Sequence, residues 1–193
     1  MMTRCPCFVF PLLLLLGTLP AGAQDGPLAQ LPGRVEHDDS RLNVILVPRT
    51  PQQMAAFYEG RGFPDAMIDL TRRYCFVTVL LQNKTEDILW HELERWRFVT
   101  ADGTAIARRS RDWWQAQWET MQAPLPSRST FRWTLLPERL DFHPGEREGG
   151  NITLERTGKP LRLIARFATG TDRTGEEIIL RLDGLRCAGD QEP

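Results

Sequence analysis

Residues 75–81 read Cys-Phe-Val-Thr-Val-Leu-Leu, and this stretch decides the fold class. In an extended chain every second side chain points to the same face. The face that begins at Cys75 and ends at Leu81 carries only apolar side chains, whereas the opposite face includes Thr78. The pattern therefore predicts a β-strand with its inner face in a hydrophobic core.

The same period-two pattern recurs along the chain and predicts a mainly β fold. Strands are expected at residues 42–46, 75–82, 96–100, 131–135, 152–154, 161–167 and 178–182. Turn-forming Gly, Pro, Asn and Asp residues separate them. About seven short strands predict an antiparallel β-sandwich, in a single domain that covers residues 41–193.

Helical insertions are expected at about residues 50–73 and 110–121, where they form a cap. Thr50 is placed to cap the first helix, and Gln53 completes a capping box. A second helix begins near Pro64. Trp114 and Trp118 fall on one stripe of a third helix that follows Ser110, and such short helices need tertiary packing.

The N-terminus has the pattern of an export signal over residues 1–23. Arg4 precedes a short apolar run from Phe8 to Leu16, and small residues follow at 21–23. The run is too short to cross a bilayer, so no stable membrane anchor is expected after cleavage. Residues 24–40, rich in Gly, Pro and Asp, are expected to form a flexible leader. The predicted location is periplasmic or secreted.

Cys75 and Cys187 remain after removal of residues 1–23, and a disulfide between them is predicted for an oxidising compartment. Cys75 lies on the inner face of its strand. Gly184 offers a place for a bulge that brings Cys187 to the inner face of the last strand. Two separate buried thiols are the alternative.

Two stretches resemble exported bacterial immunoglobulin-like β-sandwich domains. The first is residues 76–85, a strand that ends at an Asn turn. The second is residues 142–154, in which Pro-Gly-Glu leads into a later strand. The resemblance covers about two thirds of the chain and implies an immunoglobulin-like fold. It implies no activity, because these domains share none.

Charge and motifs give little support for catalysis or for binding of nucleic acid. The formal charge is −1, and it becomes −2 without residues 1–23. The sequence lacks a nucleophile elbow, a phosphate loop and a dinucleotide fingerprint. His91 and Glu92 match the start of the His-Glu-x-x-His motif of zinc proteases, but Arg95 stands where the motif needs its second histidine. The run His37-Asp38-Asp39 could bind copper or zinc, but no metal site or cofactor is assigned.

Six tryptophans exceed what a minimal sandwich needs, and they suggest a binding surface. Trp96 and Trp133 alternate with phenylalanines and are expected in the core. The predicted binding surface lies where the third helix meets the 50–73 insertion, and its residues are Tyr58, Arg61, Arg111, Trp113 and Gln117. Alternatively, these residues plug one end of the sandwich.

The expected function is that of an exported, non-enzymatic binding or accessory module with a protein partner in the cell envelope. The alternative is a periplasmic protein that binds a small ligand or a metal, copper or zinc.

Overall fold

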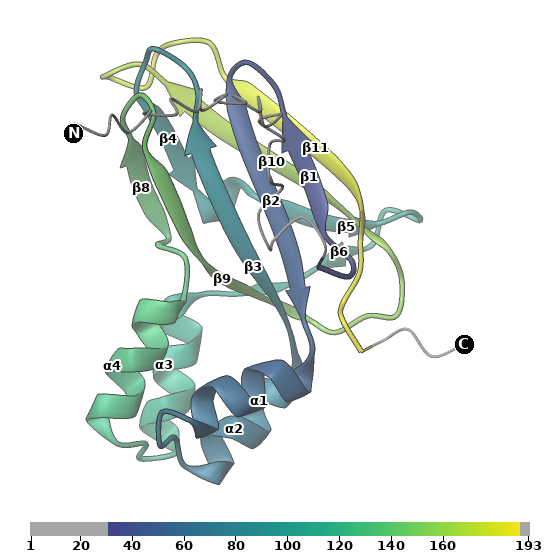
Figure 1. Ribbon diagram of the computed structural model, residues 1–193, viewed down its shortest axis with the longest axis vertical. Coiled ribbons are helices and arrows are strands. Elements are labelled where there is room, and N and C mark those ends of the chain that lie inside the picture. The colour runs from purple at the N-terminus through teal and green to yellow at the C-terminus, as the bar shows by residue number, and fades with distance from the viewer. Residues whose placement is uncertain (1–30, 190–193) are drawn as a thin grey trace, which may run out of the picture.

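The computed structural model describes residues 31–189, which form two antiparallel β-sheets and four α-helices (Figure 1). The predicted export signal, residues 1–23, lies outside the described residues, as do residues 24–30 of the predicted leader. The mainly β class is confirmed. The described residues form eleven strands, however, rather than about seven.

The first sheet has the strand order β1-β2-β3-β9-β7. Its strands are β1 (Val35–Asp38), β2 (Leu42–Arg49), β3 (Tyr74–Asn83), β9 (Arg147–Glu155) and β7 (Arg108–Arg109). The central strand β3 alternates as the sequence predicts, with Cys75, Val77 and Val79 buried on the inner face. Strand β1 lies within residues 24–40, so the sheet begins inside the segment that was expected to be a flexible leader.

The second sheet has the strand order β6-β5-β10-β4-β8, and β11 pairs with β10. Its strands are β4 (Leu89–Glu92), β5 (Arg97–Thr100), β6 (Ala105–Ile106), β8 (Arg139–Phe142), β10 (Leu161–Thr169) and β11 (Ile178–Leu185). A single 3-10 turn, Leu93–Arg95, connects β4 to β5. The inner faces of both sheets enclose the main hydrophobic core.

The predicted disulfide between Cys75 and Cys187 is confirmed, with the two Cα atoms 5.4 Å apart. The register between β10 and β11 shifts so that Leu163 faces Leu182 but Leu161 faces Leu185. Gly184, with a φ of 86°, lies at this bulge. The bulge returns Leu185 and Cys187 to the core, as the sequence predicts.

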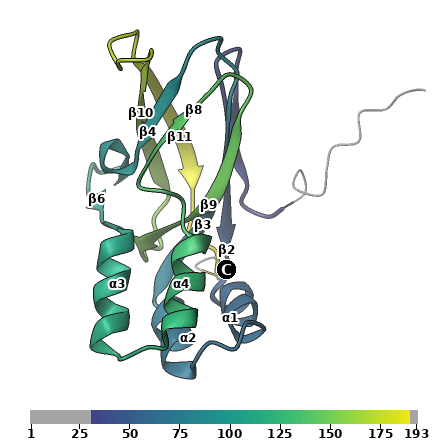
Figure 2. The ribbon, with the colours of Figure 1, turned by 90° about the vertical axis from the view of Figure 1, so that its left-hand side faces the viewer.

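The helices form a separate layer at one end of the sandwich (Figures 1 and 2). They are α1 (Pro51–Glu59), α2 (Asp65–Arg72), α3 (Arg111–Thr120) and α4 (Leu125–Thr134). The first pair connects β2 to β3, and the second pair lies between β7 and β8. The capping box of Thr50 and Gln53 is confirmed. The layer has its own aromatic core, which Phe76 enters from the outer face of β3.

The helix α4 corrects the prediction of a strand at residues 131–135. Phe131 and Leu135 are buried, but Trp133 is 85% exposed. The prediction that Trp133 belongs to the core is therefore wrong, because on a helix this residue points away from the two buried neighbours. Trp96 is buried as predicted.

Candidate functional site

The structure places Tyr58 inside the helical layer rather than on a surface. Its side chain is fully buried against Phe63 and Phe131, with ring centroids 4.7 and 5.3 Å away. The phenol donates a hydrogen bond to Thr134 Oγ1 over 2.9 Å, because the Thr134 proton is used on the Phe131 carbonyl. Burial raises the pKa of Tyr58 far above its ordinary value. Tyr58 therefore stabilises the layer and cannot touch a partner.

Trp113 and Arg111 anchor α3 to its neighbours. The half-buried indole of Trp113 packs against Tyr74 and Trp114, with ring centroids 5.1 and 5.0 Å away. The backbone N–H of Arg111 donates to Glu138 Oε1 over 2.7 Å, and its guanidinium donates to the Leu135 carbonyl. These contacts resemble those of a plug more than those of a free binding surface.

Arg61 lies exposed after the C-terminus of α1. Its guanidinium carbon is 3.5 Å from the centroid of the Phe57 ring, and it donates to the Phe57 carbonyl over 2.8 Å. Gln117 is half-buried on α3. Within residues 31–189, no hydrogen bond, ion pair or ring contact joins Arg61 to Arg111, Trp113 or Gln117. The predicted residues therefore share one layer without forming one site.

Trp133 marks a groove that sequence reasoning missed. The groove lies between α1, α4 and the outer face of the first sheet, and its volume is about 510 Å³. Its lining consists of Arg49, Gln53, Met54, Phe57, Thr78, Trp133, Thr134, Gly149, Gly150 and Asn151. An exposed indole beside a hollow with a polar floor is typical of a binding site rather than of a core.

The floor of the groove is a row of hydrogen-bonded side chains on three adjacent strands. Thr78, on β3, accepts a hydrogen bond from Arg49 Nε over 2.8 Å. Its hydroxyl donates to Asn151 Oδ1, also over 2.8 Å. The register places Thr78 directly opposite Asn151 on β9. The row fixes the orientation of Arg49 and Asn151 before any ligand arrives.

Glycines allow α4 to come close to this floor. A Cβ atom on Gly150 would lie 2.5 Å from the backbone nitrogen of Leu136, so a side chain there would push away the segment that follows α4. A second hollow of about 480 Å³ shares Gly149 with the groove and continues along the outer face of the sheet past Ile45 and Leu80. Together the two hollows provide room for an elongated ligand.

Glu138 joins the helical layer to the sandwich, because it binds both Arg108 on β7 and the first residue of α3, Arg111. Burial opposes its ionisation, but hydrogen bonds from the Arg108 guanidinium, one of them 2.6 Å long, and from the Arg111 backbone outweigh burial. Its pKa is therefore held below the ordinary value. The carboxylate is fully engaged in this structural role and is not a candidate for acid–base chemistry.

The metal-binding candidates are dispersed. Within residues 31–189, no three His, Cys, Asp or Glu side chains gather closely enough to hold a metal ion. His37 Nε2 lies 3.1 Å from Asp39 Oδ2, which makes a pair rather than a cluster. His91 is buried on β4, and residues 93–95 form a single 3-10 turn, so the zinc-protease helix does not exist here.

No family model and no curated protein matches the chain. Among solved structures, the YjhA protein of Bacillus subtilis is similar, with a TM-score of 0.39 and 9% identity over 67% of this chain and 76% of that protein. A putative lipoprotein of Bacillus subtilis, YcdA, is similar with a TM-score of 0.40 and 13% identity. That match covers 77% of this chain but 38% of the lipoprotein. Within residues 31–189, no helix has the length and apolar character that a bilayer crossing needs.

Proposed function

We propose that the protein is an exported, non-enzymatic binding module of the cell envelope and that the Trp133 groove is its binding surface. The observation that carries the proposal is the position of Trp133, 85% exposed at the edge of a groove of about 510 Å³. Exposing an indole to water is costly unless a partner covers it, and tryptophan is enriched among the residues that dominate binding energy.

Export to an oxidising compartment is the second part of the proposal. The signal pattern of residues 1–23 supports it, and so does the disulfide between Cys75 and Cys187, because such bonds persist outside the reducing cytoplasm. We also propose that the two sheets form an immunoglobulin-like sandwich. The intact mass of the protein isolated from the envelope should correspond to a chain that begins within a few residues of Gln24.

The binding surface is tested by photocrosslinking in intact cells. The photoreactive residue p-benzoylphenylalanine replaces Trp133 in one variant and Leu125 in a matched control. Both positions are exposed on α4, at 85% and 68%, but Leu125 does not line the groove. We expect a crosslinked adduct from position 133 and none from position 125.

The outcome that contradicts the proposal is equal crosslinking, or none, from the two positions while both variants stay folded. Folding is checked by circular dichroism, which should not change because both side chains project from the surface of one helix. Protease treatment of the adduct then shows whether the bound molecule is a protein.

A further inference from the structure

We infer that the Trp133 groove binds an acidic glycan, meaning a chain of sugars that carry carboxylates. This inference rests on the proposed function, because it takes the groove as the binding surface. It replaces the expectation of an envelope protein partner with a ligand of defined chemistry. Three features of the groove support it: the hydrogen-bond donors that the groove offers, the acceptors that its lining lacks, and the shape of its floor.

The polar side chains of the groove present free donors. Arg49 uses Nε on Thr78, and its Nη1 and Nη2 groups make no hydrogen bond within residues 31–189. Asn151 uses Oδ1 to accept from Thr78, which leaves the Nδ2 amide group free. Gln53 uses Oε1 to accept from the backbone N–H of Thr50, which leaves Nε2 free. The hydrogen bonds of the capping box and of the groove floor therefore occupy the acceptor oxygens of Gln53 and Asn151. They leave the amide donors of both side chains available to a ligand.

The lining offers almost nothing to a ligand that donates. The Trp133 groove contains no Asp or Glu, and Arg49 is its one charged residue. The adjoining hollow adds one charge of each sign, Arg147 and Glu148, so the positive charge of Arg49 is not cancelled. The hydroxyl of Thr134 is occupied, since it donates to the Phe131 carbonyl and accepts from Tyr58. A ligand that supplies acceptors and negative charge therefore fits, and a carboxylate suits the planar donors of Arg49 in particular.

At the Thr78–Asn151 pair, the floor leaves no room for the main-chain pairing by which sheets bind extended peptides. At Thr78, strand β3 pairs with β2 on one side and with β9 on the other. On the far side of β9, the carbonyl of Asn151 accepts from the backbone N–H of Leu136. No strand edge is therefore open at the Thr78–Asn151 pair, so recognition there must come from side chains. The flat indole of Trp133 can stack on the apolar C–H face of a sugar ring, while the donors bind its carboxylate.

The test is isothermal titration calorimetry of the mature, disulfide-bonded protein with tetragalacturonate. We expect binding that weakens by about tenfold or more in Trp133→Ala, as for an aromatic anchor, and in Arg49→Gln, which removes the guanidinium. Two control variants should bind as the wild type does. Leu125→Ala changes another exposed side chain of α4, and Arg181→Gln removes an exposed arginine from the second sheet.

Two comparison ligands complete the test. Poly-glutamate carries carboxylates without sugar rings, and cellotetraose carries sugar rings without carboxylates. Tight binding of either one at the level of tetragalacturonate overturns the inference, as does an absence of tetragalacturonate binding. If position 133 crosslinks to a protein in cells while tetragalacturonate does not bind, the glycan is wrong and the binding surface stands. If neither experiment gives a signal, both proposals fall.

Discussion

At the level of single residues, Asn83 shows how one buried polar side chain joins three segments. The side chain is fully buried at the end of β3. Its Nδ2 group donates to the carbonyls of Asp87 and Phe142 over 2.8 and 2.9 Å. Its Oδ1 accepts from the backbone N–H and the hydroxyl of Thr85. The full hydrogen-bonding capacity of the amide is therefore used.

Replacing Asn83 with Ala should destabilise the fold by about 2–4 kcal/mol, because two buried carbonyls lose their donors. Asn83→Asp should be nearly as costly, since the carboxylate would face the same two carbonyls. Asn43→Ala is the matched control on the surface of β2, with an expected change within about 0.5 kcal/mol. Urea unfolding measures all three. A change in Asn83→Ala as small as that of the control would show that the network contributes little.

His91 is a buried histidine that stays neutral in the folded state. It is fully buried between Trp96 and Phe142, with ring centroids 6.0 and 5.6 Å away. Burial is the main cause that lowers its pKa to about 4, against the opposing effects of the Pro137 carbonyl and the Glu138 carboxylate. Neither ring nitrogen has a hydrogen bond of good geometry within the described part of the chain.

The lowered pKa of His91 predicts a loss of stability on mild acidification. Between pH 6.5 and about 4 the unfolded chain binds a proton on His91 that the folded chain does not bind. The stability from the neutral imidazole is therefore complete above pH 6.5 and is lost as pH falls toward 4, by up to about 1.4 kcal/mol per pH unit. His91→Phe should flatten this slope in urea unfolding, whereas His143→Gln, at an exposed turn, should not. Equal slopes in wild type and His91→Phe would contradict the prediction.

At the level of elements, the sequence predicts α1, α2 and α3 but not α4, and the reason is local ambiguity. Phe131 and Leu135 are four residues apart, so both a strand and a helix place them on one face. Residue 133 distinguishes the two, because it is buried in a strand and exposed in a helix. Pro124 and Pro126 mark the start of α4 and would have favoured the helix. The misread element carries the exposed indole, so the candidate site was missed with it.

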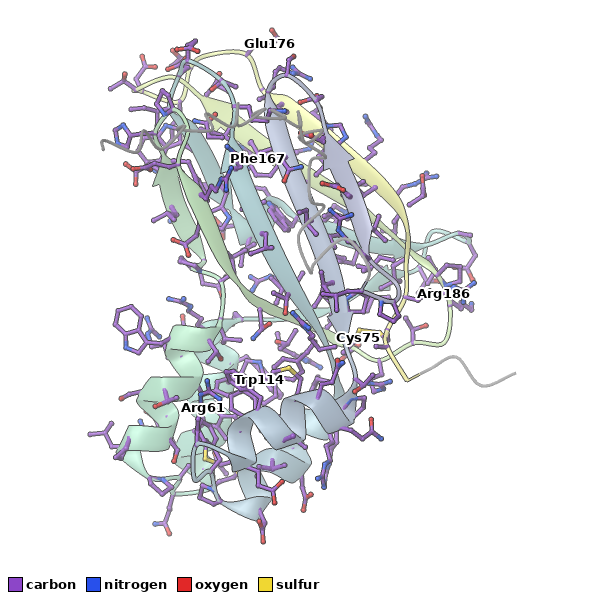
Figure 3. All side chains as sticks on the ribbon, viewed as in Figure 1. Arg61, Cys75, Trp114, Phe167, Glu176 and Arg186 are labelled. Carbon is purple, nitrogen blue, oxygen red and sulfur yellow. A yellow bond between two sulfur atoms is a disulfide. The ribbon has the colours of Figure 1, made fainter. Side chains whose placement is uncertain are left out.

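The two adjacent tryptophans of α3 should differ in their contribution to stability. Trp114 is 1% exposed, and its Nε1–H donates to Thr153 Oγ1 over 2.7 Å. Figure 3 shows Trp114 inside the helical layer. Trp113 is half-buried and has the Arg109 guanidinium 4.9 Å from its ring. Trp114→Ala should cost about 3–5 kcal/mol, in the range of large aromatic truncations, and Trp113→Ala about 1–2 kcal/mol. Comparable losses of unfolding free energy in the two variants, measured by chemical denaturation, would mean that both indoles belong to the hydrophobic core.

At the level of the whole molecule, β3 contributes side chains to three different environments. Its inner face enters the sandwich core, Phe76 enters the helical layer, and Thr78 lies on the groove floor. The alternation that predicts the inner face is visible in residues 75–81. The groove cannot be predicted from these residues, because its floor forms only when strand pairing brings Arg49, Thr78 and Asn151 together from three strands. Such long-range registers are not encoded in a local period.

The disulfide joins the two sheets near the helical layer, since Cys75 is the second residue of β3 and Cys187 follows β11 (Figure 3). The sequence separation is 112 residues, so the bridge restricts a large loop in the unfolded chain.

The double variant Cys75→Ala/Cys187→Ala should therefore lose about 2–5 kcal/mol of unfolding free energy, with little change in far-ultraviolet circular dichroism, because both sheets keep their hydrogen bonds. Thiol labelling of denatured, unreduced protein from the envelope is the control, and wild type should take up no label. Labelling of both cysteines would show that the bridge does not form in the cell. An unchanged unfolding midpoint in the double variant would show that the sheets hold together without it.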